Sequence, residues 1–208
     1  KYKFRNAIFV NARSLLQGAK VSESRSEKYD KKDELLKYTG LNEIQTCEAV
    51  HSKDSFSIAF RTAVGGYKIT YSGDTRPNNQ LVDIGRNSDL LIHEATYSNS
   101  GRDEAKLRMH SITAEAVQVG RMMNAKFTVL THFQRMFNRI PLMEDFQDEA
   151  NVGIAFDGMV VNLKSMYSIP DMYPDLNRIF EDDIKDIKAI LLKAKPVKIV
   201  ALNDDDRL

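Results

Sequence analysis

The side chains in this sequence that could do chemistry are its histidines and a few acids, and they occur at similar positions. Each histidine lies close to a hydrophobic run that predicts a strand end or a helix start: His51, His93, His110 and His132. Three such runs end in metal-binding side chains: 68–73 before Asp74, 89–92 before His93-Glu94, and 127–131 before His132. Because the carboxyl ends of strands in α/β folds meet at one crevice, these side chains are expected to converge. A mixture of His, Asp and Glu suits a divalent metal, most simply zinc.

The segments that must position these residues alternate between strands and helices. Gly65-Gly66 supplies the positive φ of a tight hairpin between two predicted strands. Apolar residues recur with a helical period in the segment 175–193. The predicted strands are about 55–63, 66–72, the run to His93, the run to His132, and 151–156 and 158–163 joined at Asp157-Gly158; the predicted helices are 12–22, 33–38, 79–86, Ser111 or Thr113 to Asn124, and 175–193. Residues 98–109 are polar and predicted to be mobile.

This order of elements predicts an α/β fold with a mixed sheet under helical cover. Hairpins interrupt the strand–helix alternation that a purely parallel sheet would require. Cys47 is the single cysteine, which excludes an intrachain disulfide, and it is predicted to be buried near the start of a strand. No Gly-x-Gly-x-x-Gly or Walker loop occurs, which argues against nucleotide binding.

Composition places the chain among ordinary globular proteins. The 208 residues are 42% hydrophobic, and 30 Lys and Arg against 29 Asp and Glu leave a net charge of +1. This balance neither indicates nor excludes a nucleic-acid substrate, because charge can be concentrated in a cleft. No apolar run approaches the ~18 residues of a membrane span, so no membrane partner is expected. The opening Lys1-Tyr2-Lys3-Phe4 lacks signal-peptide architecture and indicates a chain cut within a longer protein.

Taken one at a time, the candidate residues have ordinary structural interpretations. Asp74 could be a turn residue before Pro77, and Glu94 could be the partner of a nearby arginine. The order of short motifs is more specific: Ser72-Gly73-Asp74-Thr75, His93-Glu94-Ala95-Thr96, His110-Ser111 and Thr131-His132-Phe133, with Gln45-Thr46-Cys47 leading to His51. In this order the motifs resemble the C-terminal part of the long form of tRNase Z, from about residue 12 to 190. That family comprises zinc-dependent endonucleases that remove 3′ trailers from precursor tRNA.

The resemblance implies a fold and a set of roles. The fold would be the C-terminal half of a metallo-β-lactamase αβ/βα sandwich, comprising residues 1–208 with an acidic tail after the 175–193 helix. His51, Asp74 and His132 would bind two zinc ions about 4 Å apart, bridged by Asp74. Glu94 and His110 would relay a proton to the departing ribose oxygen, an expected role for an imidazole that a carboxylate orients. Further expected roles are a supporting shell of His93 and Thr75, and substrate contacts by Arg135 and Asp157.

The sequence departs from the family pattern in two places. Where the family has Ser-Gln-Arg-Tyr, this chain has Gln134-Arg135-Met136-Phe137, which shifts the arginine by one residue. The motif His-x-His-x-Asp-His is absent from the 208 residues, and so is the arm that grips the tRNA elbow. The remainder of the same enzyme is therefore expected to supply the motif, and this chain alone is expected to be inactive. The family further implies precursor tRNA as substrate, and the nucleus and mitochondrion as locations.

Two alternatives remain open from the sequence. One is another metallo-β-lactamase hydrolase that acts on small esters or thioesters, against which His93-Glu94-Ala95-Thr96 argues. The other is a non-catalytic partner subunit of the same fold. Joint retention of the candidate residues argues against that second alternative: His51, Asp74, Glu94, His110 and His132.

Overall fold

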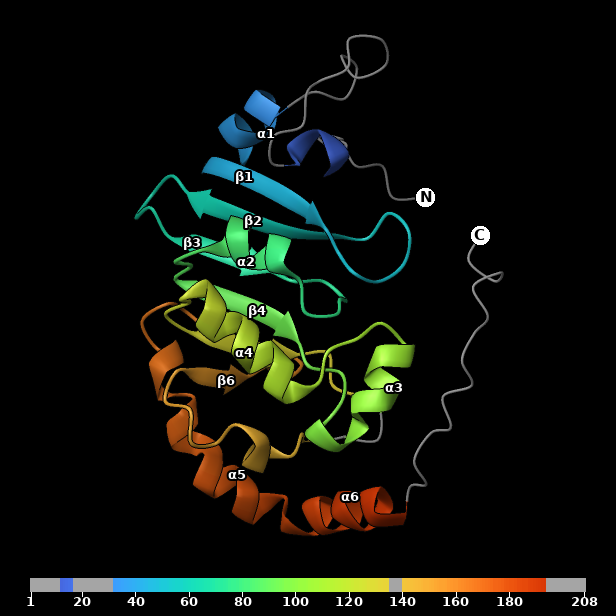
Figure 1. Ribbon diagram of the computed structural model, residues 1–208. Coiled ribbons are helices and arrows are strands. Elements are labelled where there is room, and N and C mark those ends of the chain that lie inside the picture. The colour runs from blue at the N-terminus through green and yellow to red at the C-terminus, as the bar shows by residue number, and fades with distance from the viewer. Residues whose placement is uncertain (1–11, 17–31, 135–139, 194–208) are drawn as a thin grey trace, which may run out of the picture.

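The computed structural model describes residues 12–16, 32–134 and 140–193. Their helices and strands alternate along most of the chain (Figure 1). The elements are η1 Ala12–Leu15, α1 Lys32–Thr39, β1 Leu41–Glu48, β2 Phe56–Thr62, β3 Lys68–Tyr71, α2 Asn79–Gly85, β4 Leu90–Glu94, η2 Asn99–Gly101, α3 Arg102–Leu107, α4 Thr113–Met123, β5 Thr128–Thr131, η4 Met143–Asp145, β6 Val152–Ile154, η5 Met166–Ser168, η6 Pro170–Met172, α5 Tyr173–Ile179 and α6 Glu181–Lys193. None of the helices within these ranges is long and apolar enough to cross a membrane.

One six-stranded sheet has the spatial order β1-β2-β3-β4-β5-β6. The β1–β2 and β2–β3 pairs are antiparallel, whereas β3, β4, β5 and β6 run parallel to one another. The carboxyl ends of β1, β3, β4, β5 and β6 therefore lie at the same edge of the sheet. The predicted mixed α/β class is confirmed, and the hairpin turn at Gly65 and Gly66 has the expected positive φ values of 80° and 65°.

Helices α2 and α4 cover one face of the sheet (Figure 1). The strand residues beneath them are closely packed: Ala59 and Leu91 are buried, and Gly120 of α4 lies so near Thr128 that an added Cβ would approach its hydroxyl to 2.3 Å. On the opposite face over β2, β3 and β4, alternate residues such as Ile58 and Ile92 are only partly buried. The two faces of these strands are therefore unequally covered.

A second core lies around β5 and β6. Phe127, Val152 and Ile154 pack there against the segment after β6, including Ile169 and Tyr173. The Tyr173 hydroxyl donates to the Val152 carbonyl at 2.7 Å, and burial raises its pKa far above the ordinary value. This segment closes the β6 side of the sheet.

Several sequence predictions of local structure are wrong. The second strand of the predicted 151–163 hairpin does not form, because Met159 turns back to the Phe156 carbonyl and the following chain is irregular. The 98–109 segment is helical rather than mobile, since Ala105 of α3 is fully buried. The predicted 175–193 helix is two helices that meet at Phe180.

The N-terminal predictions also need correction. Of the predicted 12–22 helix, the described part is a short 3-10 turn ending at Leu15, and the rest lies outside the described residues. Strand β1 was not predicted, because its apolar residues do not alternate regularly along the strand. Cys47 is buried as expected, with its pKa raised to about 11 by burial, but it lies near the end of β1 rather than the start. The acidic tail at 204–206 lies outside the described residues.

Candidate functional site

All four metal-competent positions that follow strands are found at the carboxyl edge of the sheet, where the parallel strands end. Asp74 lies three residues after β3, Glu94 is the last residue of β4, and His132 follows β5 directly. His51 lies in the loop after β1. His110 comes from the loop between α3 and α4, so five segments of the chain contribute to one cluster.

His51 and Asp74 face each other. His51 Nδ1 lies 3.0 Å from the Met109 carbonyl, to which it can only donate, so in the neutral imidazole Nε2 presents a lone pair. That Nε2 lies 3.9 Å from Asp74 Oδ2. A lone pair opposite a carboxylate is favourable when a cation lies between them, and metal-bound histidines usually donate their other N–H to a carbonyl or carboxylate in this way. This arrangement fits a metal ligand pair.

Thr96 links the remaining members of the cluster. The Thr96 hydroxyl donates to Glu94 Oε2 at 2.7 Å, and the Thr96 hydroxyl oxygen also lies 2.8 Å from His132 Nδ1. Because the hydroxyl proton is engaged by Glu94, the His132 Nδ1–H donates to Thr96, which leaves Nε2 of His132 free for a ligand. His132 Nδ1 also lies 3.5 Å from Asp74 Oδ1. His132 adopts φ of 60°, a left-handed conformation that is uncommon for residues other than Gly.

Glu94 and His110 form a close pair. His110 Nδ1 lies 2.9 Å from Glu94 Oε1, and the same carboxylate accepts the backbone N–H groups of Thr75 at 2.9 Å and Thr96 at 3.1 Å. The Glu94 side chain is 2% exposed, whereas those of Asp74 and His132 are 38% and 50% exposed. The cluster therefore has a buried carboxylate at one end and an open face at the other.

The structure offers two overlapping sets of possible metal ligands within the described residues. One is His51, Asp74 and His110, and the other is Glu94, His110 and His132; within each set the ligand atoms lie within 4.8 Å of one another. His110 belongs to both sets, although the sequence motif gives it the role of an acid. The His and carboxylate donors suit zinc chemistry.

Two supporting residues predicted from sequence lie behind the cluster. Thr75 donates its backbone N–H to Glu94 and accepts the Val50 N–H through its hydroxyl at 2.9 Å. His93 is fully buried on the α4 face of β4 and donates to the Glu94 carbonyl at 2.6 Å. Burial lowers the pKa of His93, and its Nε2 has no hydrogen-bond partner among the described residues. It is therefore a neutral imidazole under the strand.

Of the two predicted substrate contacts, the structure describes only Asp157. Asp157 lies in an exposed turn after β6, with Gly158 at φ of 76°, and within the described ranges its carboxylate makes no hydrogen bond or ion pair with the histidines. Arg135 lies outside the described residues. The sequence analysis gave no role to Thr96, although Thr96 lies in the same short motif as Glu94. A hydroxyl two residues after Glu94 was the feature of the sequence that could have predicted this contact.

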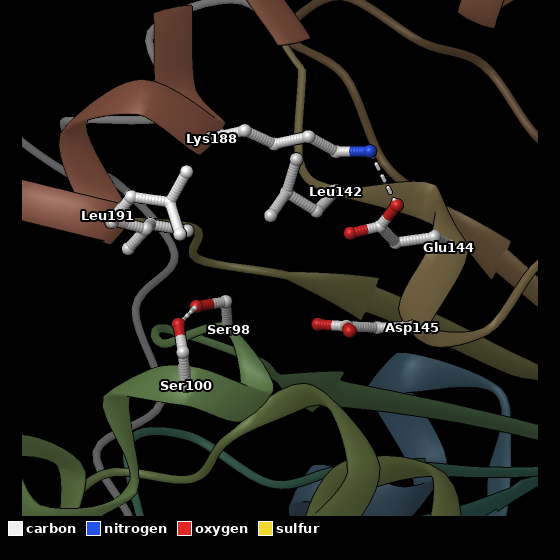
Figure 2. Close-up of a pocket in the computed structure, with 8 residues that line it drawn as sticks. Ser98, Ser100, Leu142, Glu144, Asp145, Lys188 and Leu191 are labelled. Carbon is white, nitrogen blue, oxygen red and sulfur yellow. Dashed lines mark hydrogen bonds and ion pairs between the residues drawn. The ribbon is translucent and has the colours of Figure 1, made fainter. Parts of the chain in front are cut away.

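A separate cavity of about 380 Å³ lies between η2, η4 and α6. Figure 2 shows the Lys188–Glu144 ion pair and the Ser98–Ser100 hydroxyl pair on its walls. Burial raises the pKa of Asp145, which also lines it. None of the candidate site residues lines this cavity, so the cavity is separate from the candidate metal site.

Comparisons with known proteins find relatives by sequence. No family model matches the chain. It is 37% identical over 178 residues to zinc phosphodiesterase ELAC protein 2 of Homo sapiens and 37% identical over 164 residues to the mitochondrial ribonuclease Z of Drosophila melanogaster. These matches cover 86% and 77% of the chain, but the chain spans only 21% of each relative's length.

The fold comparison gives the same relationship. The structure superposes on a long-form RNase Z from yeast with a TM-score of 0.64 and 31% sequence identity, over 71% of this chain and 21% of that one. The mixed sheet and its helices thus have the arrangement found in that RNase Z over the matched part of this chain. The chain belongs to the long-form ribonuclease Z family, as its motifs indicated.

Proposed function

We propose that this chain forms part of an endoribonuclease that removes the 3′ trailer from precursor tRNA. The observation that carries the proposal is the Glu94–His110 pair, placed beside the His51–Asp74 pair at one sheet edge. An acid/base pair next to a metal-competent pair suits hydrolysis of a phosphodiester. Membership of the ribonuclease Z family selects tRNA as the substrate.

His51, Asp74 and His132 would hold two zinc ions together with ligands from the rest of the enzyme. Asp74 lies between two of these histidines: Oδ2 is 3.9 Å from His51 Nε2, and Oδ1 is 3.5 Å from His132 Nδ1, so the carboxylate is within reach of ions held by either residue. Bound zinc would supply an activated water and stabilise negative charge on the phosphate. The donor set supports zinc over calcium or magnesium, because imidazole nitrogens prefer it.

Glu94 and His110 would handle the proton of the leaving group. The buried carboxylate accepts the His110 Nδ1–H, and a second proton carried on Nε2 would pass to the departing ribose 3′-oxygen, leaving His110 as a neutral imidazole. Two backbone N–H groups and the Thr96 hydroxyl donate to Glu94 and hold its carboxylate in place. The product would be a tRNA with a 3′-hydroxyl ready for CCA addition.

The remainder of the sandwich would come from the same enzyme. The partly buried residues on the face of β2, β3 and β4 opposite α2 and α4 support this, since Tyr71 there is 44% exposed among the described residues. A second layer carrying His-x-His-x-Asp-His would cover that face and complete the metal centre. Isolated residues 1–208 would then have low solubility and no activity. The mitochondrial designation of the Drosophila relative supports a mitochondrial location, and the nucleus is inferred from the family alone.

The test is a cleavage assay on the complete enzyme that contains this segment. Precursor tRNA with a 3′ trailer should be cut once, 3′ to the discriminator nucleotide, and a chelator should stop the reaction. The Asp74→Asn variant is the control for the site. Turnover of small esters with intact precursor tRNA would instead support a different metallo-hydrolase, and no turnover of either would support a non-catalytic subunit.

A further inference from the structure

Arg76 lies where three loops of the candidate site meet. Its backbone N–H donates to the Val50 carbonyl at 2.9 Å, next to His51. Its guanidinium Nη1 donates to the His110 carbonyl at 2.5 Å. Arg76 is two residues from Asp74 and so belongs to the same loop. It therefore links the Asp74 loop to the loops that carry His51 and His110.

Glu115 holds the other side of the guanidinium. Nη1 and Nη2 of Arg76 each donate to one Glu115 oxygen at 2.7 Å, a paired geometry that only a planar fork can make. The two side chains are 15% and 14% exposed. Burial alone would raise the pKa of Glu115, but hydrogen bonds from Arg76 and from the Ile112 N–H lower it below its ordinary value. The pair is therefore ionised and fixed.

The loop that carries His110 needs such an anchor. Met109, just before His110, has φ of 59°. Apart from Gly, Asn, Asp and His, residues rarely adopt this left-handed backbone conformation. Ser111 Oγ donates to the Thr75 carbonyl at 2.6 Å, so the loop is also tied to the Asp74 side. Glu94, in contrast, belongs to a strand with neighbours on both sides. The spacing of the Glu94–His110 pair thus depends on how the His110 loop is held.

We propose that Arg76, backed by Glu115, is a positioning residue that places the His110 imidazole on Glu94. It acts through the His110 main chain, since its guanidinium donates to the His110 carbonyl and to Glu115. This inference rests on the proposed function, since the role of His110 as an acid gives the positioning its catalytic value. A displacement of about 1 Å at such a group can cost about 10²-fold in rate.

The test is a double-mutant cycle in the complete enzyme with Arg76→Met, His110→Ala and both together. Arg76→Met is expected to lower kcat by about 10- to 100-fold with KM and zinc content unchanged. In the His110→Ala background the same change should have no further effect, because the group it positions is gone. Equal losses in both backgrounds, or loss of zinc in proportion to activity, would overturn the proposal.

Lys126→Met is the matched control, since it removes the Lys126–Asp89 ion pair of 2.6 Å at the opposite edge of the sheet and should leave kcat unchanged. If Arg76→Met does not fold, Glu115→Gln takes its place in the cycle. Nitrogen-15 NMR of His110 separates this proposal from the proposed function. The Nδ1–H resonance should shift in Arg76→Met but not in Lys126→Met, even in an enzyme that cuts no tRNA, and an unchanged resonance contradicts the positioning role.

Discussion

The parallel strands begin at one edge of the sheet and end at the other. Left-handed backbone conformations occur at both edges, but different residue types adopt them. Where β4 and β5 begin, the left-handed positions are Asn87 and Asn124, with φ of 58° and 56°, and their side chains hydrogen-bond each other at 2.7 Å. After the same two strands, the left-handed positions among the described residues are Met109 and His132. Asn and His adopt this conformation more often than most residue types, whereas Met109 does so at a cost in energy.

The polar groups differ in the same way. At the starting edge, Lys126 is 65% exposed in its ion pair with Asp89. At the carboxyl edge, Glu94 is almost fully buried and its oxygens accept hydrogen bonds from three groups of Thr75 and Thr96, besides contacting His110. Strain and buried charge concentrated at the carboxyl edge indicate a site that the fold maintains for chemistry. The edge where the strands begin lacks this combination in the described residues.

The largest effect is expected at Asp74. Asp74→Asn removes the charge that faces both His51 and His132, so the complete enzyme should lose zinc and about 10³-fold or more of its cleavage rate. Elemental analysis and a precursor-tRNA assay measure the two losses together. An Asp74→Asn enzyme with full zinc content would show that the metal lies elsewhere, and the comparison of edges would lose its basis.

Removal of His110 should come next. His110→Ala is expected to slow cleavage by about 10²–10⁴-fold, the usual contribution of a positioned acid, while zinc content stays nearly intact. Glu94→Gln should behave similarly, because it removes the charge that orients the imidazole. Since His110 belongs to both possible ligand sets, loss of one zinc equivalent in His110→Ala would identify it as a ligand instead of an acid.

Thr96→Val should have a smaller effect of about 10-fold to 100-fold on activity, the range found when a group behind a metal ligand is removed. The substitution keeps the shape of the side chain but deletes the hydroxyl that joins Glu94 and His132. Kinetics with zinc-loaded enzyme measures it. Ser98→Ala, which removes a buried hydroxyl outside the cluster, is the matched control and should keep full activity.

Glu115→Gln should destabilise the fold in a pH-dependent manner. Because the folded-state pKa of Glu115 is lowered, its contribution to stability is present above its ordinary pKa of about 4.3 and is lost as pH falls through the folded value. At neutral pH the variant should unfold about 1–3 kcal/mol more easily, the cost of a lost hydrogen bond to a charged group. Thermal unfolding at pH 7 and at pH 3 checks this, and a constant difference between the two conditions would contradict it.

Lys126→Met at the starting edge should have the smallest effect. Because Lys126 is exposed to solvent, its ion pair contributes little, so unfolding should change little and cleavage should not change. Urea denaturation and the cleavage assay provide the measurements. A loss of activity similar to that of Thr96→Val would mean that the two edges are coupled.

Sequence alone was sufficient for the residues whose positions follow from strand ends. Asp74, Glu94 and His132 each follow or end a run of β-branched residues, and parallel pairing of β3, β4 and β5 brings such ends together. Their roles come from family resemblance and stay predictions. The same argument from apolar runs wrongly predicted a strand at 158–163. The apolar residues of this segment pack on the core, but its backbone does not pair with another strand.

Contacts made through main-chain atoms could not be predicted. Arg76 reaches the His110 carbonyl across 34 residues of sequence, and His51 reaches the Met109 carbonyl across 58. Any residue type supplies a carbonyl, so no motif marks these partners. The irregular loops that present them have no period from which their shape could be read.

The most direct test of the central claim is a zinc count on residues 1–208, alone and mixed with a fragment that carries His-x-His-x-Asp-His. The chain alone should bind no zinc tightly, because His51, Asp74 and His132 leave each of two ions short of the three protein ligands usual in catalytic sites. The mixture should bind two zinc ions and gain chelator-sensitive trailer cleavage at the same time. Two tightly bound zinc ions in the chain alone, or none in a confirmed complex, would contradict the account.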